Sequence, residues 1–268
     1  MDGLFTPVGP RRTFEGAVEQ IAERIRLGDF VAGDRLPSER ELAAALRISR
    51  PTLREAVRVL ADAGVLEVRT GSGGGIFVRS DYVPLDLLRS KSDLRLGEVA
   101  GVLEARRMIE PRVAELAALN AREEDFARMQ QTIDAQQELL AAGDVLDNED
   151  RFLQLDTRFH LHMARATGNS TIVSMMRMLL NRLEIARDIA VHEPPIPAWM
   201  IDVHERTLAA IRSADHERIE TVMDEHLAAM ERAWEQATDR VLVRPVPEFL
   251  RPLAQRDRGR DDTDEGTG

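Results

Sequence analysis

Three histidines and one aspartate occupy positions that would place them inside a bundle of helices. Asp156 and His160 are four residues apart in a helical segment, so they lie about 40° apart around its axis. His204 and His226 belong to two later segments, where apolar residues at helical spacing put both on inward faces. Imidazole nitrogens and a carboxylate at such spacing are typical ligands of a divalent metal ion.

Each histidine taken alone has an alternative explanation, because a single inward histidine is usually a hydrogen-bonded core residue. Three of them with an aspartate are harder to explain in this way, since each buried polar group would need its own partner. One shared cation would satisfy all four groups at once. The spacing therefore favours a metal site and leaves the structural alternative open.

A row of arginines near the N-terminus is a second group of chemically active residues. Arg50, Arg54 and Arg58 follow one another at intervals of four and cover about 80° of a helix circumference. An apolar sector lies beside this row, so one side of the helix packs while the neighbouring side presents guanidinium groups. Guanidinium groups bind phosphates and guanine edges, so the row predicts contact with nucleic acid.

Two short helices position these arginines. Ser38 and Glu41 form a capping box that begins the first helix, and Ser49 caps the second, in which Pro51 lies in the first turn. A break at residues 47–49 separates them. Helix, tight turn and arginine-bearing helix follow in the order of a helix-turn-helix.

A β-hairpin is predicted directly after the second helix. Its strands are Val65–Arg69 and Ile76–Arg79, and the connection between them is rich in glycine. Exposed glycine N–H groups can approach phosphates closely, and Thr70 can donate to one. The hairpin therefore predicts the wing of a winged helix-turn-helix. The alternative, a small domain whose arginines are merely solvated, explains the order of these elements less well.

The remaining segments are predicted to be helical, with no strong strand candidate after Val78. A helix at Phe14–Leu27 precedes the helix-turn-helix. Those of the second part are expected at Leu96–Asn120, Asp125–Ala142, Leu146–Thr167, Ser170–Val191, Ala198–Ser213 and Asp215–Arg240. Pro111 is expected to kink or interrupt the first of these, and residues 194–197 to form a rigid loop. The fold class is therefore mainly α, an N-terminal winged helix-turn-helix followed by an all-α antiparallel helical bundle.

The charge is divided unevenly along the 268 residues. The net charge of −11 argues at first against nucleic acid, but residues 1–80 hold 12 arginines against 11 acidic residues, about +1. The remainder holds 24 basic and 36 acidic residues, −12. We expect the acidic part to repel DNA and to help orient the first part.

The protein is expected to lie in the cytoplasm and not in a membrane. It contains no cysteine, which fits a reducing compartment. The first residues do not resemble a signal peptide, and no apolar run approaches the length of a membrane span.

The N-terminal part resembles the winged helix-turn-helix of the GntR family of bacterial transcription regulators, over about residues 13–79. The resemblance is carried by Gly33, Leu36–Ala43, Ser49–Ala56, Leu60, Gly64 and Leu66. It implies DNA contacts by Arg40, Arg50, Thr52 and Arg54 and, from the wing, by Thr70 and Gly71, with Arg35 and Ser49 as weaker candidates. Arg50 or Arg54 would bind a guanine, and Arg40 would grip phosphate.

The second part is similar to the FCD ligand-binding domain of the FadR subfamily, over residues 94–237. The similarity is carried by Glu104–Arg106, Glu110, Asp156–His160, Ala166–Asn169, His204 and His226. Many members bind a metal through such an aspartate and three histidines, which supports Asp156, His160, His204 and His226 as ligands. They would leave two positions of an octahedral ion open for water or a carboxylate. Zn²⁺ or Ni²⁺ suits nitrogen ligands best, with Mn²⁺ as a third choice.

Two further residues are candidates for effector binding. Arg106 could anchor an anionic effector, because an inward arginine needs a carboxylate partner, but an internal pair with Glu104 or Glu110 is an equal alternative. Asn169 is the second candidate, and a role as helix cap explains it better.

These observations predict a metabolite-responsive transcription regulator, typically a repressor in this family, rather than an enzyme. It would bind a palindromic double-stranded operator as a homodimer, and a small carboxylate metabolite would bind at the metal. A metal-dependent hydrolase or lyase with a DNA-binding appendage is the first alternative, but no general base stands at useful spacing. An architectural DNA-binding protein with a structural metal is the second.

The predicted division of the chain follows from these parts. It comprises a disordered N-terminus at 1–12, the DNA-binding domain at 13–79, a linker at 80–93, the effector domain at 94–240 and a largely disordered tail at 241–268. Leu85, Leu87 and Leu88 in the linker are expected to pack on the second domain.

Overall fold

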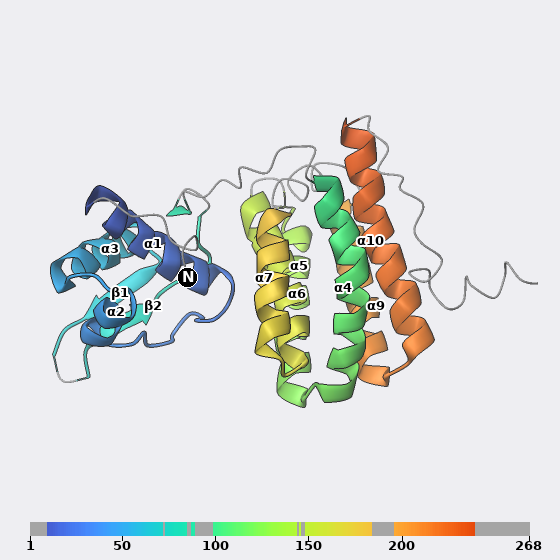
Figure 1. Cartoon of the computed structure of the whole chain (residues 1–268), viewed down its shortest axis with the longest axis horizontal. Coiled ribbons are helices and arrows are strands. Elements are labelled where there is room, and N and C mark those ends of the chain that lie inside the picture. The colour runs from blue at the N-terminus through green and yellow to red at the C-terminus, as the bar shows by residue number, and fades with distance from the viewer. Residues whose placement is uncertain are drawn as a thin grey trace, which may run out of the picture. The chain divides into compact units, whose positions relative to one another are not determined.

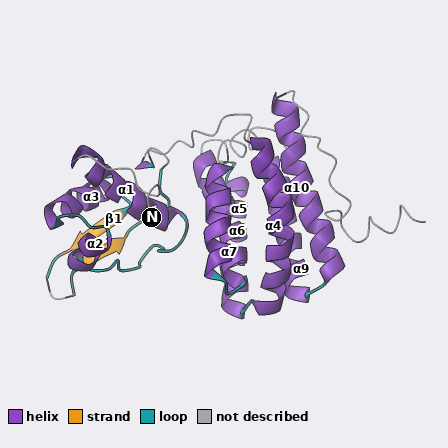
Figure 2. Cartoon of the chain, viewed as in Figure 1, coloured by secondary structure: helices purple, strands orange, loops and turns teal. Residues whose placement is uncertain are grey.

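The computed structural model describes residues 10–71, 73–84, 87–88, 99–143, 145, 148–183 and 196–238. The chain divides into two compact units, residues 1–91 and 92–268 (Figure 1). Helices dominate both, and the small two-stranded sheet belongs to the first unit (Figure 2). The predicted fold class is confirmed. Among the described residues, no helix combines the length and apolar character that crossing a membrane requires.

The first unit contains three helices and a hairpin. Its elements are α1 (Pro10–Arg26), α2 (Glu39–Ala45), α3 (Arg50–Asp62), β1 (Leu66–Arg69) and β2 (Gly75–Val78). The N-terminal helix begins at Pro10, four residues before the predicted start at Phe14, and the rest of the predicted disordered segment lies outside the described residues.

Local capping explains where α2 and α3 begin. The Ser38 side chain accepts from the backbone N–H of Glu41, and the Glu41 carboxylate accepts from the N–H of Ser38 at 2.9 Å. Ser49 accepts from the N–H of Thr52 at 3.2 Å at the start of α3. Between the helices, Arg47 adopts a left-handed φ of 53°, which turns the chain sharply.

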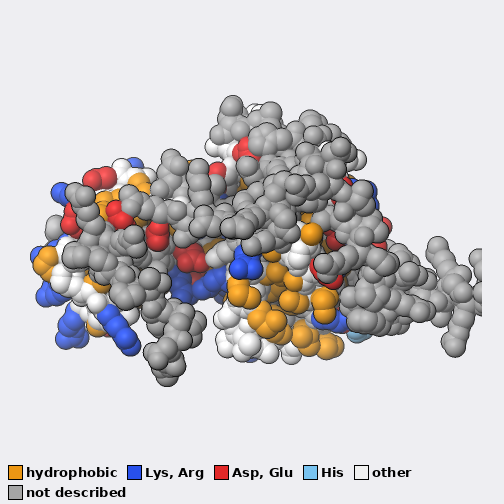
Figure 3. Space-filling model, turned by 45° about the horizontal axis from the view of Figure 1, so that its top comes forward, with side chains coloured by type: hydrophobic (Ala, Val, Ile, Leu, Met, Phe, Trp, Pro, Cys, Tyr) orange, Lys and Arg blue, Asp and Glu red, His pale blue; other side chains and the backbone are white. Residues whose placement is uncertain are grey.

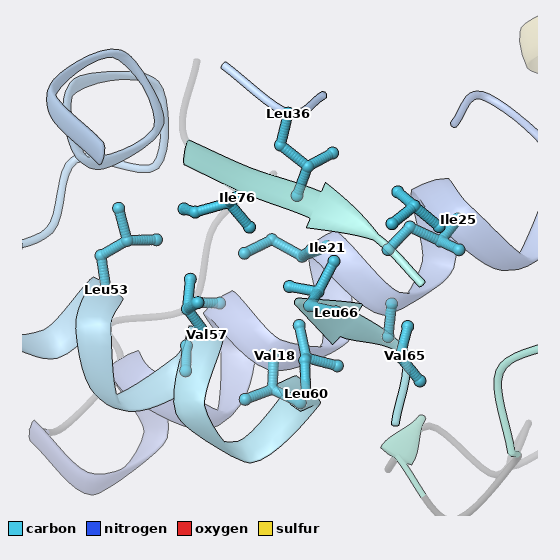
Figure 4. Close-up of a cluster of buried hydrophobic side chains, with 14 of the residues drawn as sticks. Val18, Ile21, Ile25, Leu36, Leu53, Val57, Leu60, Val65, Leu66 and Ile76 are labelled. Carbon is cyan, nitrogen blue, oxygen red and sulfur yellow. The ribbon is translucent and has the colours of Figure 1, made fainter. Parts of the chain in front are cut away.

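The hairpin pairs β1 with β2 in antiparallel register, with Leu66 opposite Val78 and Arg69 opposite Gly75. A side chain at Gly74 would meet the carbonyl oxygen of Arg69 at 2.4 Å, so the turn needs glycine there. Side chains from α1, α3 and the hairpin point toward one another and form the core of the unit (Figure 4). Those labelled are Val18, Ile21, Ile25, Leu36, Leu53, Val57, Leu60, Val65, Leu66 and Ile76.

The segment after β2 belongs to the first unit. Val83 is fully buried in its core, and Leu87 and Leu88 pack against the same cluster. The prediction that Leu87 and Leu88 pack on the second domain is therefore wrong, and Leu85 lies outside the described residues. The physical reason is an anchor, because the buried Arg26 guanidinium donates to the Val83 carbonyl at 2.7 Å.

The second unit is all-helical over its described residues. Its helices are α4 (Val99–Asn120), α5 (Glu123–Ala141), α6 (Glu149–Ala166), α7 (Ser170–Arg182), α9 (Ile196–Ser213) and α10 (His216–Thr238). The first helix continues through Pro111 instead of ending there. Ile196 and Pro197 were predicted to lie in a loop, but they form the start of α9. The predicted extension of α7 to Val191 lies beyond the described residues.

Helix α6 is central to this unit, in contact with α4, α5 and α7 (Figure 1). Most of its side chains from Phe152 to Ala166 are buried, although several of them are polar. A helix buried on all sides is normally apolar all round. Its buried polar residues therefore indicate a site inside the bundle.

Leu53→Ala tests the packing of the first unit. Leu53 is fully buried, so its truncation should lower the free energy of unfolding by about 2–5 kcal/mol. Both tryptophans lie at 199 and 234, in the second unit. In a denaturant titration, we expect part of the unfolding transition measured by far-ultraviolet circular dichroism to move to lower denaturant concentration. The unfolding transition measured by tryptophan fluorescence should not change. A shift of both would contradict separate packing, and Arg58→Ala on the same helix is the control.

Candidate metal centre and nucleic-acid interface

The arginine row on α3 faces away from the core of the first unit. The side chains of Arg50 and Arg54 are 59% and 63% exposed, whereas Leu53 and Val57 on the same helix are buried. Figure 3 shows Lys and Arg side chains in blue along the outer surface of this unit. The helix therefore packs through one side and leaves two guanidinium groups accessible to a ligand.

Glu39 on α2 holds both guanidinium groups. Nε of Arg54 donates to its two oxygens at 3.0 and 3.2 Å, and Nη2 of Arg50 donates at 3.3 Å. Slight burial raises the pKa of Glu39, but the hydrogen bonds from Arg54 and Arg50 lower it below the usual value. This carboxylate therefore stays ionised and arranges the arginines side by side.

The other predicted DNA contacts lie on α2 and on the wing of the same unit. Arg40 on α2 is exposed, and so are Thr70 and Gly71 at the tip of the hairpin. Arg35 donates to the Gly74 carbonyl at 2.7 Å, which fixes it against the wing.

Ser49 and Thr52 have structural partners at the start of α3. Their hydroxyl oxygens are 2.7 Å apart, and the Ser49 oxygen also accepts from the N–H of Thr52. Thr52 is half-buried, so part of its side chain is accessible to a ligand. The Ser49 hydroxyl oxygen already accepts the capping hydrogen bond.

Inside the second unit, the four predicted metal ligands converge from three helices. Asp156 and His160 come from α6, His204 from α9 and His226 from α10, and all four are buried. One ring nitrogen of each histidine lies within 4.8 Å of the corresponding nitrogens of the other two. Oδ1 of Asp156 is 3.3 Å from Nε2 of His204 and 3.9 Å from Nε2 of His160.

Aromatic packing fixes the orientation of these rings. His204 stacks on Phe159, with the ring centroids 4.1 Å apart, and its Nδ1 lies 3.2 Å from Oε1 of Gln136 on α5. His160 stands edge-on to His226 at 4.9 Å. The nitrogen of His204 that remains, Nε2, therefore faces Asp156.

The chemistry of this donor set fits a cation. Nδ1 of His226 is buried without a hydrogen-bond partner among the described residues. Burial, and then the neighbouring His160 and His204, hold the pKa of His226 well below its usual value, so its ring is neutral and can offer a lone pair. A divalent ion would use these nitrogens and would balance the carboxylate of Asp156.

A buried ion pair adjoins the histidines. Arg106 and Glu110, both on α4, are fully buried, with Nε to Oε1 at 2.5 Å and Nη2 to Oε2 at 3.1 Å. Oε2 of Glu110 also lies 3.0 Å from Nδ1 of His160. Burial alone would raise the pKa of Glu110, but Arg106 and then His160 bring it well below its usual value. The internal partner considered for Arg106 is thus Glu110.

Asn169 caps α7. Its side-chain oxygen accepts from the N–H groups of Thr171 at 3.0 Å and Ile172 at 3.4 Å, and the residue is exposed. The structure gives it the cap role that the sequence favours.

Sequence reasoning did not assign Glu39 and Gln136 to either site. Glu39 lies one residue after the capping Ser38, where an acidic residue is expected at a helix start for other reasons. Gln136 lies on a different helix from any predicted ligand, and its spacing gives no signal.

The chain matches two known families in consecutive regions. Residues 13–78 match "Bacterial regulatory proteins, gntR family", and residues 101–229 match the FCD domain. The Uxu operon transcriptional regulator of Escherichia coli is 30% identical over 229 residues, which are 81% of this chain and 84% of that protein.

Two further similarities extend over most of the chain. The HTH-type transcriptional repressor NanR of Cronobacter sakazakii is 27% identical over 240 residues, 85% of this chain and 88% of that protein. A solved structure of Streptococcus agalactiae GntR is 26% identical and covers 82% of this chain and 99% of that chain, with a TM-score of 0.44.

The family's members are DNA-binding transcription regulators, and nothing in these matches supports the alternative of a metal-dependent enzyme. This chain is a transcription regulator of the GntR family with a C-terminal FCD domain.

Proposed function

We propose that this regulator binds a palindromic operator as a homodimer and releases or grips it in response to a small carboxylate bound at a divalent metal. By analogy with NanR, whose name describes a repressor, we propose repression as its mode of action. The DNA-reading part would comprise residues 13–79 and the effector part residues 94–240. Residues 80–93 would join them within the cell's cytoplasm, with Val83, Leu87 and Leu88 packed on the first unit. The observation that carries the proposal is the convergence of His160, His204 and His226 in the bundle, with Asp156 beside two of them.

DNA recognition would use the accessible side of α3. Arg50 and Arg54 would enter the major groove, where a guanidinium binds guanine O6 and N7. Arg40 and Thr52 would contact the backbone, and Thr70 and Gly71 would reach it from the wing. Arg50 and Arg54 both donate to Glu39 in the structure. At least part of these hydrogen bonds would therefore break when the two guanidinium groups bind DNA.

The metal would be Zn²⁺ or Ni²⁺, with Mn²⁺ as an alternative, since three imidazoles dominate the ligand set. When bound, it would supply a Lewis-acidic centre for a carboxylate oxygen. Arg106 would contribute the second anchor, because its Nη1 is buried without a hydrogen-bond partner among the described residues. A guanidinium with a donor to spare suits an anionic ligand. An effector role of Asn169 remains a prediction beside its capping role.

A second copy would be needed to read a palindrome. The helical unit exposes large apolar side chains on two helices in contact, α4 and α7, and Figure 3 shows hydrophobic side chains gathered on one face of this unit. The exposed large apolar side chains of these two helices are Met108, Leu116 and Leu119 on α4 and Met175 and Met178 on α7. Burying them against an identical surface would give a twofold interface.

The function as a whole is tested by selecting binding sites from fragmented genomic DNA with the full chain. Two inverted half-sites with centres about 10 base pairs, or a multiple of this, apart are expected. A thermal-shift screen of small carboxylates with and without chelator then tests the effector. An acid that stabilises only the metal-loaded protein and changes operator affinity supports the proposal; no sequence-specific binding at all contradicts it.

Arg54→Ala should weaken binding to the selected operator by about 1–3 kcal/mol and relax selectivity at one position, if this arginine reads a base. The measurement is fluorescence anisotropy at fixed salt. Arg24→Ala is the control, because this exposed arginine lies on α1 and pairs with Asp29. Unchanged affinity of Arg54→Ala would reject the role.

Replacing His204 and His226 with alanine should remove the metal, because two of the three nitrogen ligands disappear. Elemental analysis of the purified chain should give one equivalent for the wild type and close to none for the double variant. His216→Ala, an exposed histidine beside Glu115, should keep its metal. Metal retained in full by the double variant would place the ion elsewhere.

A further inference from the structure

Glu110 lies between the two groups that the proposed function assigns to ligand binding. Its Oε2 accepts from Nη2 of Arg106 at 3.1 Å and lies 3.0 Å from Nδ1 of His160. The three side chains are buried to 1% exposure or less. One carboxylate oxygen thus contacts both the proposed effector anchor and a proposed metal ligand.

A side-chain oxygen lies close to the outer nitrogen of both His160 and His204. Nδ1 of His204 lies 3.2 Å from Oε1 of Gln136, and its Nε2 faces Asp156. Nδ1 of His160 lies against Glu110, and its Nε2 also faces Asp156, at 3.9 Å. An acceptor behind a metal-binding imidazole fixes the proton on the outer nitrogen and makes the inner nitrogen a better ligand. Gln136 stands in that position behind His204. The charged oxygen of Glu110 lies 3.0 Å from Nδ1 of His160 without the geometry of a hydrogen bond, close enough for its charge to act on the ring.

Glu110 differs from Gln136 in carrying a charge that Arg106 also uses. In a buried site the attraction between opposite charges is strong, so a guanidinium in contact with the carboxylate reduces what it contributes at His160. A cation on Nε2 of His160 and the guanidinium of Arg106 therefore draw on the same negative charge. His160 lies on α6, whereas Arg106 and Glu110 lie on α4.

We propose that Glu110 is a positioning residue that couples metal binding to anion binding. It orients His160 toward the cation, and its ion pair with Arg106 limits the affinity for the metal. A carboxylate effector that engages Arg106 releases the charge of Glu110 to His160 and tightens the metal, and by reciprocity the metal tightens the effector. This inference rests on the metal site of the proposed function.

The test uses Zn²⁺ alone, titrated into the full-length chain in competition with a chromophoric chelator. Glu110→Gln should weaken Zn²⁺ binding about 10–100-fold. Arg106→Met should strengthen it, by about fivefold or more. The control is Glu115→Gln, which alters another buried glutamate of α4 that pairs with an arginine, Arg112, and it should leave the affinity unchanged.

A charge-neutral double variant guards against misfolding. Single substitutions leave a buried charge without its partner, whereas Arg106→Met with Glu110→Gln removes both charges together. The double variant should bind Zn²⁺ about 10–100-fold more weakly than Arg106→Met alone. Far-ultraviolet circular dichroism checks that each variant is folded.

The outcomes separate this inference from the function beneath it. Unchanged affinity in Glu110→Gln, or equal weakening in Arg106→Met and Glu110→Gln, overturns the coupling. In both cases the metal site stands if the alanine substitutions of His204 and His226 still abolish binding. A wild-type chain that binds no Zn²⁺, Ni²⁺ or Mn²⁺ overturns both.

Discussion

The burial of charge in the middle of the helical unit is the constraint on which the rest of this structure depends. Asp156, Glu110 and Arg106 are all removed from water, together with three imidazoles. Such groups destabilise a fold unless each finds a partner, because their hydration is lost. Arg106 and Glu110 pair with each other on α4. Asp156 and the three imidazoles would be partnered by the proposed divalent cation.

The N-terminal unit uses charge in the opposite way. Its arginines lie on the surface of α3, where water solvates them and a duplex can reach them. Glu39 binds two of them without burying them, so the surface proposed to read DNA would be arranged before DNA arrives. In the proposed function, the interior of one unit would select a small ligand through desolvated charge, and the surface of the other would select a duplex through accessible charge. The acidic balance of the second part, −12 beyond residue 80, discourages DNA from binding there.

Much of this could be predicted from the sequence, because capping residues and helical periodicity act locally. Ser38, Glu41 and Ser49 fixed the start of two helices, and the spacing of Asp156 and His160 placed both on one face. Contacts between distant segments could not be predicted in the same way. Leu87 and Leu88 pack on the first unit because Arg26 anchors Val83, which no local pattern reveals.

The sequence also could not predict which hydrogen-bond or ion-pair partner a buried side chain would have. From the sequence, an arginine at position 106 fits an effector and an internal pair equally well, and the structure pairs it with Glu110, four residues further along the same helix. Gln136 behind His204 depends on the packing of α5 against α9. Pro111 was expected to kink or interrupt its helix, and the helix is not interrupted there. The hydrogen bond that proline cannot donate is a local loss, which packing against other helices can offset.

The most direct test of the central claim is anomalous X-ray diffraction from crystals of the full-length chain, with data collected on both sides of the zinc and nickel absorption edges. The account predicts a single strong peak in the helical unit, about 2.0–2.2 Å from a carboxylate oxygen of Asp156 and from one nitrogen each of His160, His204 and His226. Well-ordered crystals in which these four side chains surround no peak, and instead satisfy one another through hydrogen bonds and water, would contradict it.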